Sequence, residues 1–241
     1  MDEEILSTIR LRVGASAFFP QDLLSPGRVP REALGLRAQI VGKRVIDYLG
    51  AALGLLFLWP VMLAVAVAIR LDSKGPVLYR QCRLGRHGKE FLMWKFRTMV
   101  RDAEHQLGEL ERLNESPGGV LFKIRHDPRV TRVGRVLRRT SLDELPQLFN
   151  VLQGQMSLVG PRPLPLRDCG RLAEADMAGF LVRHRVLPGL TGAWQVGGRS
   201  EVGHEQMMDL DIDYVLSWSL RKDLILIAKS TFVPLCIRGA H

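Results

Sequence analysis

A stretch of 22 residues without a charged side chain, Tyr48 to Ile69, constrains the fold more than any other feature of this sequence. A straight helix of that length would extend about 33 Å, enough to cross a bilayer core of about 30 Å. Pro60 lies in the middle of the run, where it removes a backbone hydrogen bond and bends a helix. We therefore expect a membrane helix that is broken at Pro60.

Basic residues flank this run on both sides, with Lys43 and Arg44 before it and Arg70, Lys74 and Arg80 after it. A single membrane span normally carries its excess of basic residues on the cytoplasmic side. Symmetric flanks favour a re-entrant helix, which enters the membrane, turns at the proline and returns to the same face. An ordinary kinked transmembrane helix is the alternative. A buried core helix of a soluble protein fits the run poorly, because the run is apolar all round.

The apolar run divides the sequence into three segments. Residues 1–40 are punctuated by prolines and are expected to form an N-terminal extension with at most short helices. Residues 41–72 form the expected re-entrant helix, and residues 73–241 carry the remaining motifs. The run begins too late for a cleavable signal peptide and lacks a small-residue cleavage site.

Local patterns predict several elements after the membrane segment. Residues 77–83 and 90–95 alternate in polarity around a glycine-containing turn, which predicts a β-hairpin. Residues 97–113 carry apolar side chains at helical spacing and are predicted to form a helix. Asp127 followed by Pro128 is typical of a helix start, with the aspartate as the cap.

Two later stretches combine positive charge with apolar residues. In the helix expected after residue 128, Arg132, Arg135 and Arg139 share a face, which would meet water or lipid headgroups. The stretch from Asp209 to Leu235 alternates apolar blocks with basic residues, which indicates helices lying in the membrane interface or domain helices whose lysines reach water. The expected fold class is mainly α with a small β-hairpin.

The composition indicates which classes of molecule this protein is expected to bind. Lysine and arginine number 34 against 25 acidic residues, so the net charge is +9, and a polyanion, an anionic membrane surface or a phosphorylated substrate is favoured. Aromatic residues make up only 7% of the chain and do not interleave with the basic residues, which argues against nucleic acid. The three cysteines and six histidines lack the spacing of a zinc site.

The most informative polar feature is the adjacent pair Asp143 and Glu144, which follows an arginine-rich run and precedes Pro146. Proline is tolerated in the first turn of a helix, so a helix is expected to begin near residues 143–145. In one interpretation the acids merely cap that helix, with Ser141 and Glu144 forming a capping box. In the other, one carboxylate attacks or holds a metal while its neighbour orients a group or handles a proton.

The surroundings of the acid pair favour chemistry on a phosphate. Nearby arginines lower carboxylate pKa values, which would keep a nucleophile ionised, and they make bidentate contacts with phosphate oxygens. Arg162 lies between two prolines in Gly160–Pro163, which fix its backbone. Mg²⁺ is expected beside the acids, because this ion offsets the repulsion between a carboxylate and a diphosphate, although no residue spacing defines its ligands.

The apolar run with its proline, the acid pair and the turn around Arg162 together make the chain similar to the bacterial sugar transferases, the monotopic polyprenyl-phosphate phosphoglycosyl transferases. The similarity covers about residues 43–235. It includes the Lys43-Arg44 pair with the helix broken at Pro60, and the blocks at residues 75–81, 94–99, 138–150, 157–163 and 183–199.

This resemblance implies a monotopic protein of the bacterial inner membrane with a re-entrant helix, interfacial amphipathic helices and, over residues 73–241, a catalytic domain on the cytoplasmic face. It implies that a UDP-sugar gives its phosphosugar to undecaprenyl phosphate and releases UMP, at the start of exopolysaccharide or O-antigen synthesis. The C-terminal blocks favour UDP-glucose or UDP-galactose. The expected partners are the UDP-sugar, the polyprenyl phosphate and the lipid bilayer, with no nucleic acid, and a homo-oligomer is compatible with the sequence.

The resemblance also assigns roles to residues. Asp143 is expected to be the nucleophile and a magnesium ligand, Glu144 its partner acid and Arg138 a phosphate ligand. Basic positions expected around the site are Lys95, Arg97, Arg162 and Arg199. Without a multi-span region before the apolar run, the chain is expected to be a minimal catalytic form. The rival hypothesis is a non-catalytic scaffold of a polysaccharide assembly complex at the membrane, and a soluble nucleic-acid binder is a more distant one.

Overall fold

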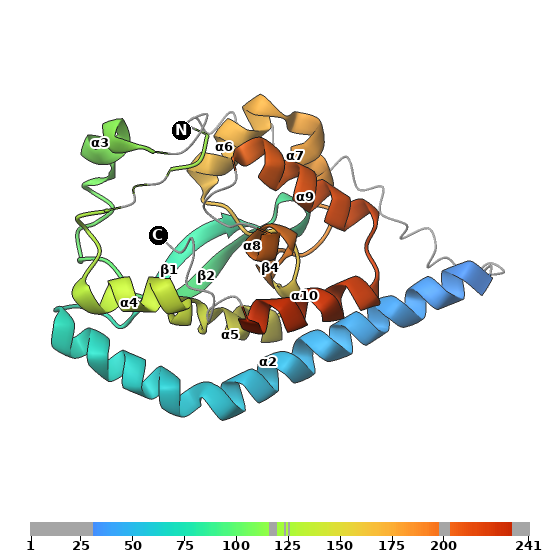
Figure 1. Cartoon of the computed structure of the whole chain (residues 1–241), viewed down its shortest axis with the longest axis horizontal. Helices are drawn as coiled ribbons and strands as arrows, with labels where there is room; N and C mark the ends of the chain where they lie inside the picture. Colours follow the sequence, from blue (N-terminus) through green and yellow to red (C-terminus); the bar gives the residue numbers. More distant parts are fainter. Residues whose placement is uncertain (1–30, 116–119, 123, 125, 198–202, 233–241) are drawn as a thin grey trace.

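The computed structural model describes residues 31–115, 120–122, 124, 126–197 and 203–232, and this part of the chain is mainly helical with two small sheets (Figure 1). The helices are α2 (Arg31–Asp72), α3 (Leu107–Leu110), α4 (Arg132–Thr140), α5 (Gln147–Leu152), α6 (Leu166–Ala175), α7 (Met177–Arg183), α8 (Ala193–Gly197), α9 (His204–Leu216) and α10 (Leu220–Phe232). The strands are β1 (Leu78–Leu84), β2 (Glu90–Phe96), β3 (Ser157–Val159) and β4 (Gly189–Thr191), and the 3₁₀ turns are η2 (Arg86–Gly88), η3 (Glu111–Leu113) and η4 (Leu142–Glu144).

Helix α2 contains the whole apolar run. It starts at Arg31, earlier than the expected boundary at residue 41, and it continues through Pro60 to Asp72. Figure 1 shows α2 as a bent helix with two arms, and a proline inside a helix is a usual cause of such a bend. In the described part of the chain, residues 35–72 are the stretch of helix long and apolar enough to cross a membrane.

The predicted β-hairpin is confirmed. Strands β1 and β2 pair antiparallel, with Leu78 opposite Phe96 and Leu84 opposite Glu90. The turn between them requires two residues with positive φ, His87 at 57° and Gly88 at 69°. Glycine adopts this conformation without the steric cost that a side chain brings.

The predicted helix over residues 97–113 is largely wrong. Only residues 107–113 are helical, as α3 and η3, whereas the segment before them runs beside residues 129–131. Met99 and Val130 form an isolated β-bridge, and the backbone N–H of Val100 donates to the carbonyl of Arg129 over 2.9 Å. Tertiary pairing of the backbone therefore overrides the helical spacing of the apolar side chains.

The predicted start of the next helix at Asp127 and Pro128 is also wrong. Helix α4 begins four residues later, where the Thr131 hydroxyl accepts a hydrogen bond from the backbone N–H of Gly134 at 3.0 Å. The Asp127 carboxylate instead pairs with the buried Arg129 guanidinium at 2.6 Å. The Asp127 carboxylate therefore forms an ion pair with Arg129 and does not cap a helix.

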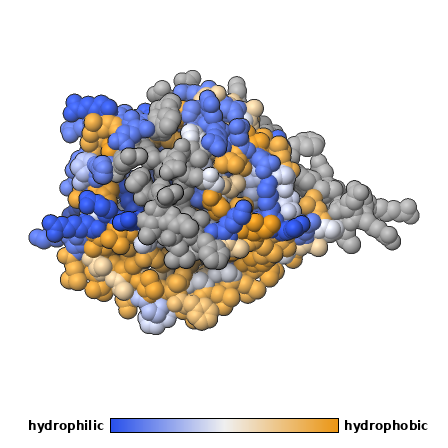
Figure 2. Space-filling view, viewed as in Figure 1, coloured by the Kyte–Doolittle hydropathy of each residue, from blue (hydrophilic) through white to orange (hydrophobic). Residues whose placement is uncertain are grey.

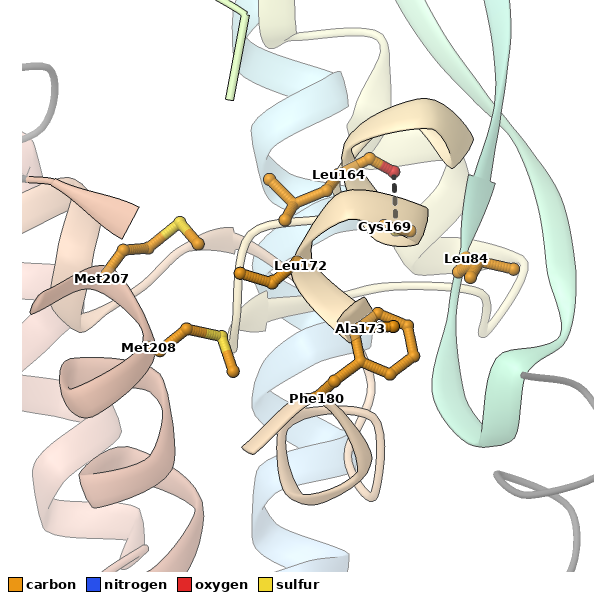
Figure 3. Close-up of a cluster of buried hydrophobic side chains, with 8 residues drawn as sticks. All are labelled: Leu84, Leu164, Cys169, Leu172, Ala173, Phe180, Met207 and Met208. Carbon is orange, nitrogen blue, oxygen red and sulfur yellow. Dashed lines mark hydrogen bonds between the residues drawn. The ribbon is translucent and has the colours of Figure 1, made fainter. Parts of the chain in front are cut away.

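The main apolar core lies on the side of the domain away from α2, between α6, α7 and α9 (Figures 1 and 3). Figure 3 shows Met207 and Met208 pointing from α9 toward Leu172 of α6 and Phe180 of α7. All four side chains are buried. This cluster anchors the C-terminal helices to the hairpin through Leu84 at the end of β1.

Helix α2 packs along the opposite side of the domain, against α4, α5, β3 and α10. Ala51 and Val65, on different arms of the helix, are both buried against the domain. Its other face leaves large apolar side chains exposed, including Phe57 at 72% and Leu71 at 83%. Figure 2 shows the resulting hydrophobic band along the lower edge, where α2 runs in Figure 1. A surface of this kind marks contact with a membrane or a partner.

Candidate active site

The adjacent carboxylates Asp143 and Glu144 lie in the 3₁₀ turn η4, between α4 and α5. Ser141 ends α4 in the left-handed conformation, with φ at 58°, and its backbone N–H donates to the carbonyl of Arg138 at 3.2 Å. Pro146 then caps α5, so the acids precede that helix instead of forming its first turn. The interpretation of Ser141 and Glu144 as a capping box is wrong, because Ser141 makes no side-chain cap and the Glu144 carboxylate binds Arg162.

Glu144 is held by two cations that come from distant parts of the chain. Its Oε1 atom accepts hydrogen bonds from Arg162 NH2 at 2.6 Å and from Lys95 Nζ at 3.2 Å, and its Oε2 atom lies 3.4 Å from Arg162 NH1. Burial by itself would raise the pKa of Glu144, but the attraction of Arg162 and Lys95 outweighs burial and holds the pKa well below its usual range. Glu144 is therefore an ionised and fixed group at neutral pH.

Asp143 has a different environment although it is the next residue. Its side chain is buried, with 8% of the residue exposed, and among the described residues no donor is hydrogen-bonded to its carboxylate. Burial raises the pKa of Asp143 to about 6, with Glu144 adding to the rise while Lys95 and the two nearby arginines, Arg138 and Arg162, oppose it. The nearby arginines lower the pKa of both carboxyl groups, as predicted, but at Asp143 desolvation outweighs them and the pKa lies above its usual value.

Arg138 extends the site along α4. Its Nε atom donates to the Thr98 hydroxyl at 2.9 Å, which orients the guanidinium group. The charge of Arg138 acts on Asp143 and that of Asp143 acts on Arg138, so the two groups are electrostatic neighbours. The structure thus brings together five of the predicted site residues, namely Asp143, Glu144, Lys95, Arg138 and Arg162.

The other predicted residues lie elsewhere. The Arg97 guanidinium binds the carbonyl oxygens of Lys74 and Ser73, at 2.9 and 2.8 Å, and so closes the end of α2 instead of joining the carboxylates. Arg199 lies outside the described residues. Pro60 lies inside α2.

Two arginines that the sequence did not single out hold the turn that carries Arg162. Arg83 donates from NH1 to the carbonyl of Pro163 at 3.0 Å, and Arg183 donates from NH2 to the carbonyl of Arg162 at 2.8 Å. Arg183 is itself paired with the buried Asp211 at 2.9 Å. The sequence carried little signal for either residue, because Arg83 follows Arg80 and Gln81 closely and Arg183 precedes His184 and Arg185. Both arginines are buried, and a buried arginine requires acceptors that fix its position.

Cations outnumber acids around the pair. Arg83, Lys95, Arg138 and Arg162 each act electrostatically on one another or on the two carboxylates, which leaves a positive excess for an incoming anion. Burial lowers the pKa of Lys95, and the charge of Glu144 opposes this effect. A phosphate group would relieve the repulsion between these cations, so the arrangement suits a phosphorylated substrate.

The residues present also fit a magnesium ion. Within the described ranges, His, Cys, Asp and Glu form no group of three that could hold a metal by themselves. Mg²⁺ commonly binds through one or two carboxylates and completes its shell with water and substrate phosphates. Asp143 can serve as such a ligand, whereas Glu144 is already occupied by Arg162 and Lys95.

Comparison with known proteins supports this interpretation. Residues 38–236 match the family model described as bacterial sugar transferase. The chain is 39% identical over 222 residues to exopolysaccharide production protein ExoY of Rhizobium meliloti (strain 1021), covering 90% of this chain and 96% of that protein. It is 40% identical to undecaprenyl-phosphate galactose phosphotransferase of Salmonella typhimurium and 39% identical to UDP-glucose:undecaprenyl-phosphate glucose-1-phosphate transferase of Klebsiella pneumoniae. These matches cover 83% and 84% of this chain but only 41% and 42% of the two relatives.

Proposed function

Because the chain belongs to the bacterial sugar transferase family, it is a polyprenyl-phosphate phosphoglycosyl transferase, and we propose that it transfers a phosphosugar from UDP-glucose or UDP-galactose to undecaprenyl phosphate with release of UMP. The names of the Salmonella and Klebsiella relatives, which specify undecaprenyl phosphate with galactose and with glucose, support both the acceptor and the choice of sugars. The similarity to the Rhizobium exopolysaccharide production protein supports a role in exopolysaccharide synthesis. We place the transfer at the first step of exopolysaccharide or O-antigen-type synthesis.

In the proposed mechanism, Asp143 attacks the phosphorus atom that bears the sugar. A carboxylate oxygen forms a bond to that phosphorus while the bond to the bridging oxygen of the diphosphate breaks, and UMP leaves with the electron pair. An oxygen of the polyprenyl phosphate then attacks the same phosphorus, which releases the carboxylate of Asp143 and yields a polyprenyl diphosphate sugar. Each step exchanges one phosphorus–oxygen bond for another, so no outside reagent is needed.

One observation favours Asp143 over Glu144 as the nucleophile. Glu144 is locked by hydrogen bonds to Arg162 and Lys95, whereas no described donor is hydrogen-bonded to the carboxylate of Asp143. A nucleophile needs an unoccupied oxygen, and loss of water around it increases its reactivity. Glu144 then acts as the counter-charge that fixes Arg162 and Lys95 near the reacting phosphates.

The cations around the pair bind and stabilise the phosphates. Arg138 and Arg162 would contact phosphate oxygens on which negative charge develops as UMP leaves. Asp143 would hold Mg²⁺ together with the diphosphate oxygens, and the ion would supply charge neutralisation there. Lys95, fixed by Glu144, would add a third positive charge.

The proposed membrane arrangement is a re-entrant α2 with the domain on the cytoplasmic face of the inner membrane. Both arms of α2 bind the same domain: Lys43 pairs with Asp223 of α10 at 2.7 Å, and Asp72 accepts from the backbone N–H of Val133 in α4 at 3.2 Å. A straight helix over residues 43–72 would extend about 44 Å, so a simple span would carry one of these ends away from the domain.

Interfacial helices would support this arrangement. Beside α2, exposed apolar side chains continue on α4 with Val136, on α5 with Phe149 and on α10 with Leu224. Arg132 and Arg135 on α4 are exposed next to them and would reach lipid headgroups. The apolar surface and its basic border would thus place the domain against the bilayer.

The test combines purified protein, undecaprenyl phosphate and a panel of UDP-sugars, with UMP release as the readout. UMP release from UDP-glucose or UDP-galactose is expected, and mass spectrometry of the enzyme without acceptor should detect a phosphosugar on Asp143. The matched variants are Asp143→Asn, which should abolish both signals, and Asp213→Asn on the exposed side of α9, which should retain them. Steady UMP release by Asp143→Asn would refute the assignment, and no release by the native chain from any UDP-sugar would favour the non-catalytic scaffold.

A further inference from the structure

Two polar residues on the buried side of α2, Lys43 and Asp47, form hydrogen bonds with each residue of strand β3. Lys43 and Asp47 are one helical turn apart and therefore lie on the same face. The Asp47 Oδ1 atom accepts from the backbone N–H of Leu158 at 2.9 Å and from the Ser157 hydroxyl at 2.9 Å. Lys43 Nζ donates to the carbonyl oxygen of Val159 at 3.0 Å. The membrane helix thus supplies hydrogen-bond partners to three consecutive residues of the domain.

These contacts complete a strand that would otherwise have an open edge. On its other side β3 pairs in parallel with β4, where Ser157 lies opposite Gly189 and Val159 opposite Thr191. Ser157 and Asp47 are both buried, with 0% and 3% of the residue exposed. Hydrogen bonds in such a water-poor environment are strong, and their loss leaves buried polar groups without partners.

Lys43 is itself held in place by the C-terminal helices. The Asp223 carboxylate binds Lys43 Nζ at 2.7 Å, and it also accepts from Trp218 Nε1 at 3.1 Å and from the Tyr214 hydroxyl at 2.8 Å. Tyr214 and Asp223 are buried. Asp223 consequently holds the ammonium group within hydrogen-bond distance of β3.

Strand β3 leads directly into the turn that carries Arg162. Val159 is followed by Gly160, whose backbone N–H donates to the carbonyl of Thr191 at 2.9 Å, and then by Pro161 with its fixed φ. Arg162 reaches Glu144 at 2.6 Å from the end of this short connection. A shift of β3 would therefore move the guanidinium group relative to both carboxylates.

We propose that Lys43 and Asp47 are positioning residues for phosphosugar transfer, through which α2 sets the place of Arg162 in the active site. The proposal rests on the function proposed above and extends it to the membrane helix. It also explains why α2 has a lysine and an aspartate on its buried face, next to a run of apolar side chains.

The test compares Asp47→Leu with Asp47→Asn and with Val65→Ala, which removes apolar packing of α2 against a different part of the domain. Asp47→Leu should lower kcat about 10- to 100-fold, because small displacements of a positioned group have effects of that size. Asp47→Asn should retain most of the rate, since its amide oxygen can accept the same hydrogen bonds. Val65→Ala should leave kcat near that of the native enzyme.

The pH profile separates positioning from a general loss of structure. Arg162 lowers the pKa of both Glu144 and Asp143. Its displacement in Asp47→Leu should therefore move the acid limb of kcat/KM to higher pH, whereas a variant that only unfolds more easily retains the native profile. If Asp47→Leu does not fold, the double variant Lys43→Met/Asp223→Asn tests the same link, because it removes the Lys43 hydrogen bond to Val159 together with the carboxylate that pairs with Lys43.

Hydrogen–deuterium exchange tests whether α2 holds β3 in place, and it requires no measurement of enzymatic activity. Peptides covering residues 157–163 should take up deuterium faster in Asp47→Leu and at the native rate in Val65→Ala. Unchanged exchange, or an unchanged acid limb in a folded Asp47→Leu enzyme, would overturn the proposal. If the native chain released no UMP, the proposed function would fail, but the exchange experiment would still decide whether α2 fixes β3.

Discussion

Replacement of Asp143 by asparagine should stabilise the protein while it abolishes the transfer. Burial raises the pKa of Asp143 from 3.8 to about 6, which means that the folded state disfavours the ionised carboxylate. A shift of about two pKa units corresponds to about 3 kcal/mol at neutral pH. Asparagine has nearly the same shape and no charge, so Asp143→Asn should recover most of this free energy of unfolding.

The gain in the free energy of unfolding depends on pH, because the pKa of Asp143 differs between the folded and the unfolded state. Above about pH 6 the native carboxylate is ionised in both states, and the full cost of burying it is present. Below pH 3.8 it is protonated in both states and the cost disappears. The advantage of Asp143→Asn should therefore be about 3 kcal/mol at pH 7.5 and about 1 kcal/mol at pH 4.5.

Thermal unfolding of the detergent-solubilised protein measures the difference. For a domain of this size, 3 kcal/mol corresponds to a rise in Tm of about 6–12 °C at pH 7.5. The matched control is Glu144→Gln, which should lower Tm, because it leaves Arg162 and Lys95 without their counter-charge. A Tm for Asp143→Asn equal to that of the native protein at pH 7.5, or a gain that does not depend on pH, would refute the assignment of a desolvated carboxylate.

Three further outcomes are expected. The kcat/KM for the UDP-sugar should fall with decreasing pH, to about half near pH 6 and about a tenth near pH 5, because only ionised Asp143 attacks; a flat profile between pH 5 and 8 would contradict this. Excess EDTA should stop UMP release and added Mg²⁺ should restore it, whereas full activity in EDTA would remove the metal from the proposed mechanism. A cysteine placed near the N-terminus should react only with reagents that reach the cytoplasm, and Pro60→Ala should straighten α2 and expose that cysteine to the periplasm; labelling from the periplasm in the native chain would contradict the re-entrant arrangement.

The parts of the fold that local chemistry determines could be predicted from the sequence. The hairpin follows from alternating side chains around a glycine-containing turn, and the long helix follows from the uncharged run. The helix expected over residues 97–113 could not be corrected from its own pattern. Residues 98–100 pair with residues 129–131, and that pairing depends on a part of the chain about 30 residues away.

The candidate site was predictable in its residue types but not in its electrostatics. Charge patterns indicated Asp143, Glu144 and Arg162, and the structure brings them together. The sequence could not show that Glu144 would bind both Arg162 and Lys95, nor that Asp143 would be desolvated without such a hydrogen bond. Arg83 and Arg183, which fix the turn around Arg162, were missed because each has polar neighbours in the sequence and resembles an ordinary surface residue until its burial is known.

The opposite pKa shifts of the two adjacent carboxyls have one physical origin. Both side chains are removed from water, and their energies then depend on which of them receives the cations. Arg162 and Lys95 bind Glu144 directly, so Glu144 stays ionised and its charge raises the pKa of Asp143 further. Two neighbouring acids whose pKa values are driven apart are suited to different roles. In the proposed mechanism, a permanently charged Glu144 would keep the cations in place throughout the reaction, and Asp143 would be the group that bonds to phosphorus and is released again.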